Sequence, residues 1–274
     1  MPLLSLAHFT IIKAGPVELI ECAARAGYDA VGLRLQPPLP GDTIVPVVGD
    51  AAMQRAVAEK LRDTGLALLD VEAFWLMPET DMETFFAGIK TGAELGAKHV
   101  LVVGNDPERA RLVERFARFC ERAKACGVIP MLEFIPYSQV RSLAEAALLL
   151  KESDAANAGL LVDSLHLSRS GGSPADLAAY DPALFRYVHL CDALAEIPAI
   201  ENLRNEARNE RLYPGEGALW LEEFVAAFPE GTPVAIEAPA ARHAHLGHAE
   251  QAKLAATMAR AVIDRADRKI PVGT

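Results

Sequence analysis

One pattern recurs along the whole chain: an amphipathic helical stretch, a glycine that ends it, and a short apolar run rich in Val, Leu and Ile. Gly27 precedes the run at residues 30–33, and Gly127 precedes the run that begins at Val128. Glycine at a helix C-terminus followed by a continuous apolar run is typical of a βα unit whose strand is covered on both faces. The chain is therefore expected to be an α/β protein.

Eight apolar runs fit this description, and together they favour a closed barrel. They lie near residues 3–9, 29–35, 66–71, 98–103, 128–134, 158–163, 185–191 and 232–238. Over 274 residues the units average about 34 residues each, which is ordinary for a (β/α)₈ barrel. The alternative, an open doubly wound sheet, lacks its G-x-G-x-x-G motif after the first run. No linker divides the chain, so we predict one TIM-barrel domain over residues 1–274.

Composition and charge limit the environment and the partners of the protein. No stretch of roughly 18 uninterrupted apolar residues occurs and the N-terminus carries no cleavage signal, so we expect a soluble, cytoplasmic protein without membrane contact. A formal net charge of −10 opposes binding to phosphate backbones and argues against nucleic acid as a partner. The four cysteines show no C-x-x-C spacing and are expected to be reduced.

Four side chains suited to metal binding stand at the downstream ends of the last four runs. They are Glu133, Asp163, His189 and Glu237. An ionised carboxylate in a buried strand is costly unless a partner neutralises it. Each residue alone is more often an ordinary polar residue of the core. In a barrel, however, the C-terminal strand ends meet at one face, where a single divalent cation would satisfy all four.

The donor set indicates both the ion and the chemistry. Three carboxylates and one imidazole favour Mn²⁺ or Mg²⁺, with Co²⁺ and Zn²⁺ as alternatives. About two coordination positions would remain for vicinal oxygens of a diol or hydroxy-ketone. Glu133 and Glu237 come from opposite ends of the ligand arc, so one would remove a substrate proton and the other return it, through a metal-stabilised enediolate.

Several short motifs resemble those of one family of barrels. Asp163 opens a D-x-x-H motif that ends at His166, His189 opens an H-x-x-D motif, and residues 214–217 read PGEG. With the glutamates of the fifth and eighth strands, these motifs resemble the xylose-isomerase-like TIM-barrel superfamily. That group includes sugar and sugar-phosphate isomerases and epimerases, inosose and 3-dehydroshikimate dehydratases, and apurinic endonucleases. The resemblance covers nearly the whole chain and implies the same barrel fold.

The resemblance also implies roles for individual residues. It implies that four residues bind the metal: Glu133, Asp163, His189 and Glu237. The two glutamates would exchange the proton and His166 would bind the substrate, as in the ketose 3-epimerase branch.

The chain departs from the endonuclease branch, which binds three zinc ions through extra histidines near the third and fourth strand ends. Here, residues 72–74 read EAF and residues 104–106 read GND. The trinuclear zinc site is therefore expected to be absent, and the acidic charge points the same way.

Further candidates for substrate binding lie near the expected barrel mouth. Arg204, Arg208 and Arg211 recur at a spacing that places them on one helix face. A clamp for a carboxylate or phosphate is favoured for Arg211, whereas a solvated charged helix is the stronger interpretation for Arg204. His8 and Arg34 lie near the ends of the first and second strands and are expected to contact substrate oxygens. A purely hydrogen-bonded histidine is an equal alternative for His8.

We therefore predict a divalent-metal-dependent isomerase or epimerase that acts on a small sugar, sugar phosphate or related hydroxy-ketone. A metal-dependent dehydratase is the main alternative, because it shares the first proton transfer. A barrel that binds a polyol or sugar acid without converting it is the third possibility. The expected partner is a small polyhydroxylated substrate, and formation of a homo-oligomer is left open.

Overall fold

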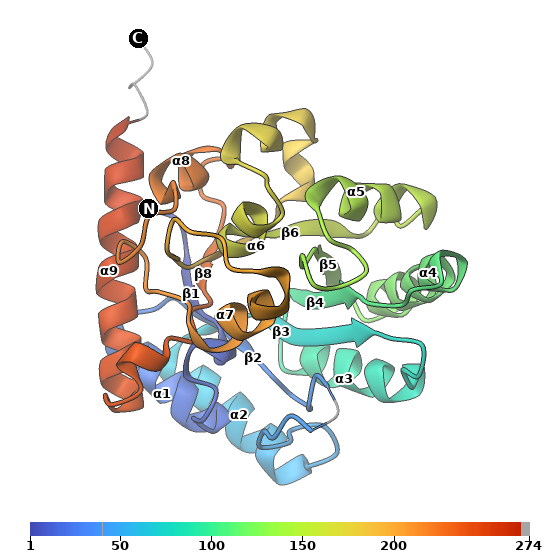
Figure 1. Ribbon diagram of the computed structural model, residues 1–274. Helices are drawn as coiled ribbons and strands as arrows, with labels where there is room; N and C mark the ends of the chain where they lie inside the picture. Colours follow the sequence, from blue (N-terminus) through green and yellow to red (C-terminus); the bar gives the residue numbers. More distant parts are fainter. Residues whose placement is uncertain (40, 270–274) are drawn as a thin grey trace.

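In the computed structural model, which describes residues 1–39 and 41–269, the predicted strands form a closed barrel (Figure 1). The strands are parallel and follow one another around the barrel in chain order. Their bounds are β1 (Leu4–Leu6), β2 (Ala30–Leu33), β3 (Ala67–Leu76), β4 (His99–Gly104), β5 (Ile129–Glu133), β6 (Gly159–Asp163), β7 (Val188–Leu190) and β8 (Val234–Ile236). The prediction of a (β/α)₈ TIM barrel is confirmed.

Helices lie around the barrel, and most of them cover the outer faces of its strands, whereas the helix at residues 203–209 lies across one end of the barrel (Figure 1). They are α1 (Pro16–Ala26), α2 (Ala51–Thr64), α3 (Met82–Glu94), α4 (Arg109–Ala125), α5 (Leu143–Glu152), α6 (Ser164–Arg169), α7 (Leu203–Asn209), α8 (Leu221–Ala226) and α9 (His248–Lys269). Helix α9 packs against α1 and α8, so the last helix closes the ring beside the first. Within the described ranges, no helix is long and apolar enough to cross a lipid bilayer.

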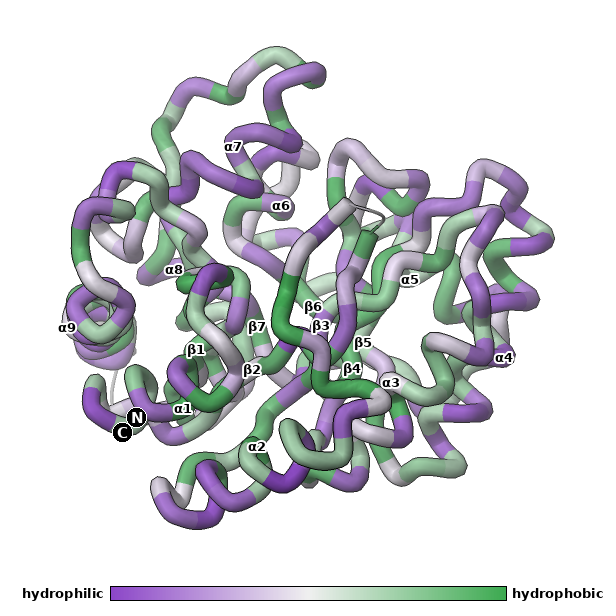
Figure 2. Tube along the Cα trace, turned by 90° about the horizontal axis from the view of Figure 1, so that it is seen from below, coloured by the Kyte–Doolittle hydropathy of each residue, from purple (hydrophilic) through white to green (hydrophobic). Residues whose placement is uncertain are grey.

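Alternation along the strands divides the buried residues between two layers. In β4, Leu101 and Val103 belong to the cluster inside the barrel, whereas Val100 and Val102 belong to the cluster between the strands and the helices. Figure 2 shows apolar residues, in green, along the central strands, and hydrophilic residues, in purple, mainly on the outer helices and loops. Because both faces of each strand are buried, the strands read as continuous apolar runs in the sequence.

Glycine ends helices at predicted positions. Gly27 and Gly65 are the C-caps of α1 and α2, with φ angles of 76° and 72°. A residue with a Cβ is strained in this left-handed conformation, and the N–H of each glycine satisfies carbonyls of the last helical turn. Each turn then directs the chain into the next strand.

The third strand differs from its predicted bounds. The apolar run predicts residues 66–71, but β3 spans Ala67–Leu76. Its pairing with β4 shifts register between Val71 and Phe74, after which Phe74 again packs toward the outer helices. The charged residue Glu72 interrupts the apolar run, which is why the sequence did not reveal the continuation.

Candidate metal centre

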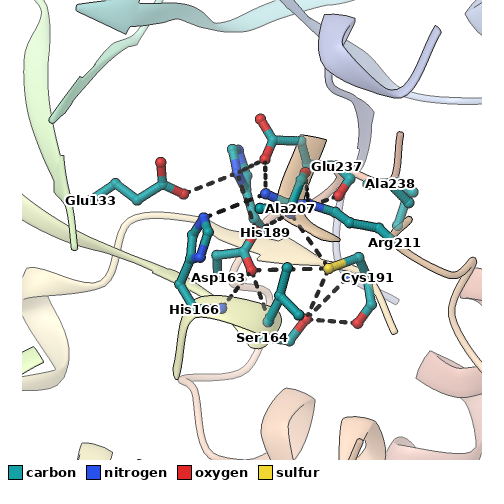
Figure 3. A network of polar contacts seen from close by, with 12 residues as sticks. Glu133, Asp163, Ser164, His166, His189, Cys191, Ala207, Arg211, Glu237 and Ala238 are labelled. Carbon is teal, nitrogen blue, oxygen red and sulfur yellow. Dashed lines mark hydrogen bonds and ion pairs between the residues drawn. The ribbon is translucent and has the colours of Figure 1, made fainter. Parts of the chain in front are cut away.

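The four predicted metal ligands converge at the C-terminal end of the barrel (Figure 3). Glu133 and Asp163 are the last residues of β5 and β6, His189 lies in β7, and Glu237 immediately follows β8. Asp163 and His189 are also register partners in neighbouring strands. All four residues are buried, and one potential ligand atom from each lies within 4.8 Å of the others. The barrel thus gathers groups that are spread over the second half of the chain.

Distances among these groups leave room for a cation. His189 Nδ1 lies 3.7 Å from Glu133 Oε1, 3.6 Å from Glu237 Oε2 and 3.9 Å from Asp163 Oδ2. These separations are too long for hydrogen bonds, and within the described ranges neither His189 Nδ1 nor Glu133 Oε1 has a hydrogen-bond partner. Ligands about 2.1 Å from one ion would lie roughly 3 to 4 Å apart. The donors and their spacing therefore fit a divalent cation.

Arg211 lies among the candidate ligands and supplies a buried positive charge (Figure 3). Its Nη1 donates to Asp163 Oδ2 at 2.5 Å and to the Glu237 carbonyl at 2.9 Å, and its Nη2 lies 2.9 Å from Glu237 Oε2. Its Nε donates to the carbonyl of Ala207 in α7 at 2.8 Å. The predicted substrate clamp is thus tied to two of the candidate ligands, which partly neutralise its charge.

When no cation is bound, the electrostatic environment shifts the pKa values of the two glutamates in opposite directions. Burial raises the pKa of Glu133 to about 7. Burial also disfavours ionisation of Glu237, but Arg211 and His189 outweigh it and hold the pKa of Glu237 well below its ordinary value. Burial lowers the pKa of His189, yet the neighbouring carboxylates raise it well above the ordinary value. The cluster therefore balances positive groups against acidic ones in a dry site.

His166 lies beside the cluster, at the start of α6. Its backbone N–H donates to Asp163 Oδ1 at 3.1 Å, and its ring Nε2 lies 3.4 Å from Arg211 Nη2. Burial lowers the pKa of His166 to about 4, so the ring is neutral near pH 7. The ring of Tyr137 stands edge-on to His166 at 6.0 Å. Tyr137 was not singled out in the sequence because it lies in a loop, outside the apolar runs.

His8 and Arg34 form a separate unit at the mouth. His8 Nδ1 accepts the backbone N–H of Arg34 at 3.1 Å, and His8 Nε2 donates to the carbonyl of Ala14 at 3.0 Å. Burial lowers the pKa of His8 to about 4, in keeping with a neutral ring that has one donor and one acceptor. The backbone uses both ring nitrogens, which favours the alternative of a hydrogen-bonded histidine that holds the end of β2. Contact of His8 with substrate stays a prediction.

A second acidic pair, neither member of which was predicted as a metal ligand, lies on β3. Asp70 and Glu72 each offer an oxygen within 4.8 Å of a nitrogen of His189. Tyr187 donates to Asp70 Oδ2 at 3.1 Å, whereas both Glu72 oxygens lack a partner in the described part of the chain. Burial raises the pKa of Asp70 to about 6 and that of Glu72 to about 8. Asp70 stands in an apolar run just as Asp163 does, and this shared signal could have revealed it.

Asp192 explains two of the sequence motifs: the H-x-x-D motif, which it ends, and the PGEG sequence at residues 214–217. Its buried carboxylate accepts hydrogen bonds from the backbone N–H groups of Gly215, Gly217 and Leu219, at 2.9 to 3.0 Å. A Cβ at position 217 would collide with this carboxylate, so the position requires glycine. The H-x-x-D motif therefore shapes the PGEG loop that follows Arg211.

A closed parallel barrel with four potential metal ligands at its C-terminal end is the architecture of a metal-binding TIM barrel. Comparison with known proteins shows to which family of such barrels the chain belongs. The sequence model of the xylose isomerase-like TIM barrel family matches residues 20–264, and the chain belongs to that family. The resemblance that the motifs suggested is confirmed.

Curated relatives of the chain are named as enzymes. A 3-dehydroshikimate dehydratase of Pseudomonas aeruginosa is 27% identical over 223 residues, which cover 76% of this chain and 33% of that protein. An inosose isomerase of Bacillus licheniformis is 28% identical over 159 residues, which cover 54% of this chain and 55% of that protein. The aligned parts thus span about a third and about half of the length of these relatives.

Solved structures share the fold. The IOLI protein with a bound zinc atom gives a TM-score of 0.79 at 21% identity, covering 96% of this chain and 98% of that one. A D-allulose 3-epimerase from Methylomonas sp. gives a TM-score of 0.68 at 18% identity, covering 97% of each chain. At these identities the likeness shows the fold alone.

Proposed function

We propose that the protein is a divalent-cation-dependent enzyme that isomerises or epimerises a small polyhydroxylated carbonyl compound by proton transfer at carbon. One observation carries the proposal: four buried groups suited to metal binding converge at the mouth of the barrel. Membership of a family with a relative named as an inosose isomerase supports the same class of reaction.

The cation would be held by Glu133, Asp163, His189 and Glu237. This oxygen-rich set favours Mn²⁺ or Mg²⁺, and Zn²⁺ and Co²⁺ are alternatives, since the structurally similar IOLI protein binds zinc. When bound, a divalent cation polarises the carbonyl and hydroxyl oxygens of a substrate and acidifies the C–H bond between them.

The protein side chains supply the proton transfers. Glu133 and Glu237 approach from opposite sides of the cluster, so they can reach the two faces of a substrate (Figure 3). One glutamate would remove the proton and the other would return it. Return to the same carbon from the other face inverts its configuration, and return to the neighbouring carbon moves the carbonyl. Arg211 and neutral His166 would hold substrate oxygens in a site from which water is excluded.

Dehydration is a second candidate, favoured by the 27% identity to a 3-dehydroshikimate dehydratase. The first step is again removal of a proton beside the carbonyl. The electron pair of that C–H bond then forms a C=C bond as the C–O bond of a hydroxyl on the next carbon breaks. The hydroxyl would leave as water after it takes a proton from a neighbouring acid, and the glutamate protonated in the first step is the candidate for this acid.

The test is incubation of Mn²⁺-reconstituted protein in D₂O with ketoses, sugar phosphates and cyclic hydroxy-ketones. Deuterium gain in an isomerised product supports the isomerase or epimerase, and loss of water supports the dehydratase. Product analysis by NMR detects an isomerase that shifts hydride without solvent exchange. Glu237→Gln should abolish turnover, whereas Arg204→Met, at an exposed site on α7, should not change it. Absence of exchange, water loss and new product from every probe would contradict the proposal.

A further inference from the structure

Arg34 is a buried cation that makes no ion pair within the described part of the chain. The residue is 6% exposed. Across residues 1–39 and 41–269, its Nε has no hydrogen-bond partner and its guanidinium makes no ion pair. The ring of Phe9, whose centroid lies 4.0 Å from Cζ, offers a cation–π contact but no counter-charge. A buried guanidinium with no anion in hydrogen-bonding contact is costly, so this position favours an anionic ligand.

Arg34 also lines a cavity of about 600 Å³. Two other cations line this cavity, but their positions differ from that of Arg34. Arg208 pairs with Asp42 at 2.7 Å, and Lys13 is exposed to solvent, where water already stabilises its charge. Of these three cations, Arg34 is therefore the one that is buried and makes no ion pair in the described part of the chain.

Arg34 lies at the same end of the barrel as the candidate metal centre. It directly follows β2, whose last residue, Leu33, pairs with Val71 of β3, so Arg34 is level with Glu72. An oxygen of Glu72 lies within 4.8 Å of a nitrogen of His189. A molecule whose vicinal oxygens occupy the metal centre can therefore extend an anionic group toward Arg34.

We infer that Arg34 binds a carboxylate of the substrate, so the compound converted is a polyhydroxylated keto acid. The inference rests on the proposed function, because it places the carboxylate on the molecule that reaches the metal centre. The planar guanidinium matches a carboxylate through two parallel hydrogen bonds. One negative charge neutralises one guanidinium, whereas a phosphate dianion would add excess negative charge near Glu72 and Glu237.

This subsite is organised before any ligand binds. The backbone N–H of Arg34 donates to His8 at 3.1 Å, His8 is fixed by the carbonyl of Ala14 at 3.0 Å, and Phe9 supports the guanidinium. Little conformational freedom is therefore lost on binding. Lysine at position 34 would keep the charge but lose both the planar fork and much of the stacking on Phe9.

The experiment measures the binding of three probes by titration calorimetry, which does not depend on turnover. The probes are 3-dehydroshikimate, a cyclic hydroxy-ketone with a carboxylate; an inosose, a cyclic hydroxy-ketone without one; and fructose 6-phosphate. Mn²⁺-loaded wild-type protein is compared with Arg34→Met and Arg34→Lys. Arg204→Met, which removes an exposed arginine, is the matched control.

The inference predicts a loss confined to the carboxylate probe. Arg34→Met should weaken its binding about 30-fold and that of the inosose less than about threefold, with Arg34→Lys in between. Arg204→Met should leave all dissociation constants unchanged. Equal effects of Arg34→Met on the acid and the inosose, a loss selective for the phosphate, or wild-type binding that favours the inosose over the acid would overturn the assignment.

Failure of the proposed reaction would look different from failure of the subsite. If no probe exchanges deuterium or loses water, yet Arg34→Met selectively weakens the acid, the carboxylate subsite stands and the reaction does not. If a neutral ketose is converted and Arg34 does not affect the affinity for the acid, the reaction stands and the subsite is overturned. Thermal unfolding verifies that each variant is folded. If Arg34→Met does not fold, the binding of the three probes to Arg34→Lys decides whether Arg34 binds the carboxylate.

Discussion

At the scale of single residues, the site depends on a positive charge held between acidic groups. Arg211 donates to Asp163 and lies 2.9 Å from Glu237, and all three residues are almost fully buried. A buried ion pair adds little net stability, but removal of one partner leaves the charge of the other uncompensated. Arg211 is therefore the group that offsets these carboxylates when no cation is bound.

Arg211→Met should lower the free energy of unfolding of chelator-treated protein by about 3 kcal/mol, because Asp163 and Glu237 lose their counter-charge. Addition of Mn²⁺ should recover part of this loss, since the cation then neutralises the same carboxylates. Urea unfolding with and without Mn²⁺ measures both effects, with Arg204→Met as the control. A variant as stable as the wild-type protein in the presence of chelator would refute this role of Arg211.

His99 permits a test of pH dependence away from the metal centre. Its Nδ1 lies 3.0 Å from the carbonyl of Leu69, and burial lowers the pKa of His99 to about 4. The unfolded chain, whose histidine pKa is about 6.5, binds more protons than the native state between about pH 6.5 and pH 4. Stability should therefore fall as the pH decreases through this window.

The contribution of His99 to this decline is at most about 3.5 kcal/mol, at about 1.4 kcal/mol per pKa unit. As the pH decreases from about 7.5 to about 4.5, the free energy of unfolding of His99→Gln should therefore fall less steeply than that of the wild-type protein. Urea unfolding across this range measures the slopes, and the exposed His245→Gln is the control. Parallel curves for His99→Gln and wild type would show that His99 is not the responsible group.

At the scale of elements, strand positions could be predicted because glycine caps and continuous apolar runs mark where each unit turns. The convergence of the last four strand ends followed from the geometry of parallel barrels. The directions of side chains in the loops could not be predicted from this geometry. Arg211 turns toward the acidic cluster and His8 bonds to the backbone, because the path of each loop depends on tertiary contacts. The extension of β3 past Glu72 was missed because this charged residue ended the apolar pattern. Asp70 was missed because a single carboxylate inside an apolar run was taken as part of the strand.

The PGEG loop gives a prediction about an element. Asp192→Asn should lower the free energy of unfolding by about 2 to 3 kcal/mol, because an amide group would face backbone donors that a carboxylate now satisfies. Chemical denaturation measures the change. Asp81→Asn is the matched control, because Asp81 is an exposed N-cap of α3 that asparagine replaces with little cost. Similar stabilities for the two variants would contradict the structural role of Asp192.

At the scale of the whole molecule, closure of the barrel creates a site that the unfolded chain does not contain. A cation bound there should therefore stabilise the folded state, by about 2.7 kcal/mol at a concentration one hundred times its Kd. Thermal unfolding at increasing Mn²⁺ should show a rising midpoint that EDTA reverses. Glu237→Gln should respond much less, and an equal response would place the ion elsewhere.

The most direct test of the central claim is a titration of chelator-stripped protein with Mn²⁺, followed by calorimetry and electron paramagnetic resonance. We predict one ion per chain, with an affinity that Asp163→Asn reduces by at least about tenfold and that Asp81→Asn leaves unchanged. No saturable binding, or binding that is insensitive to Asp163→Asn, would contradict the account.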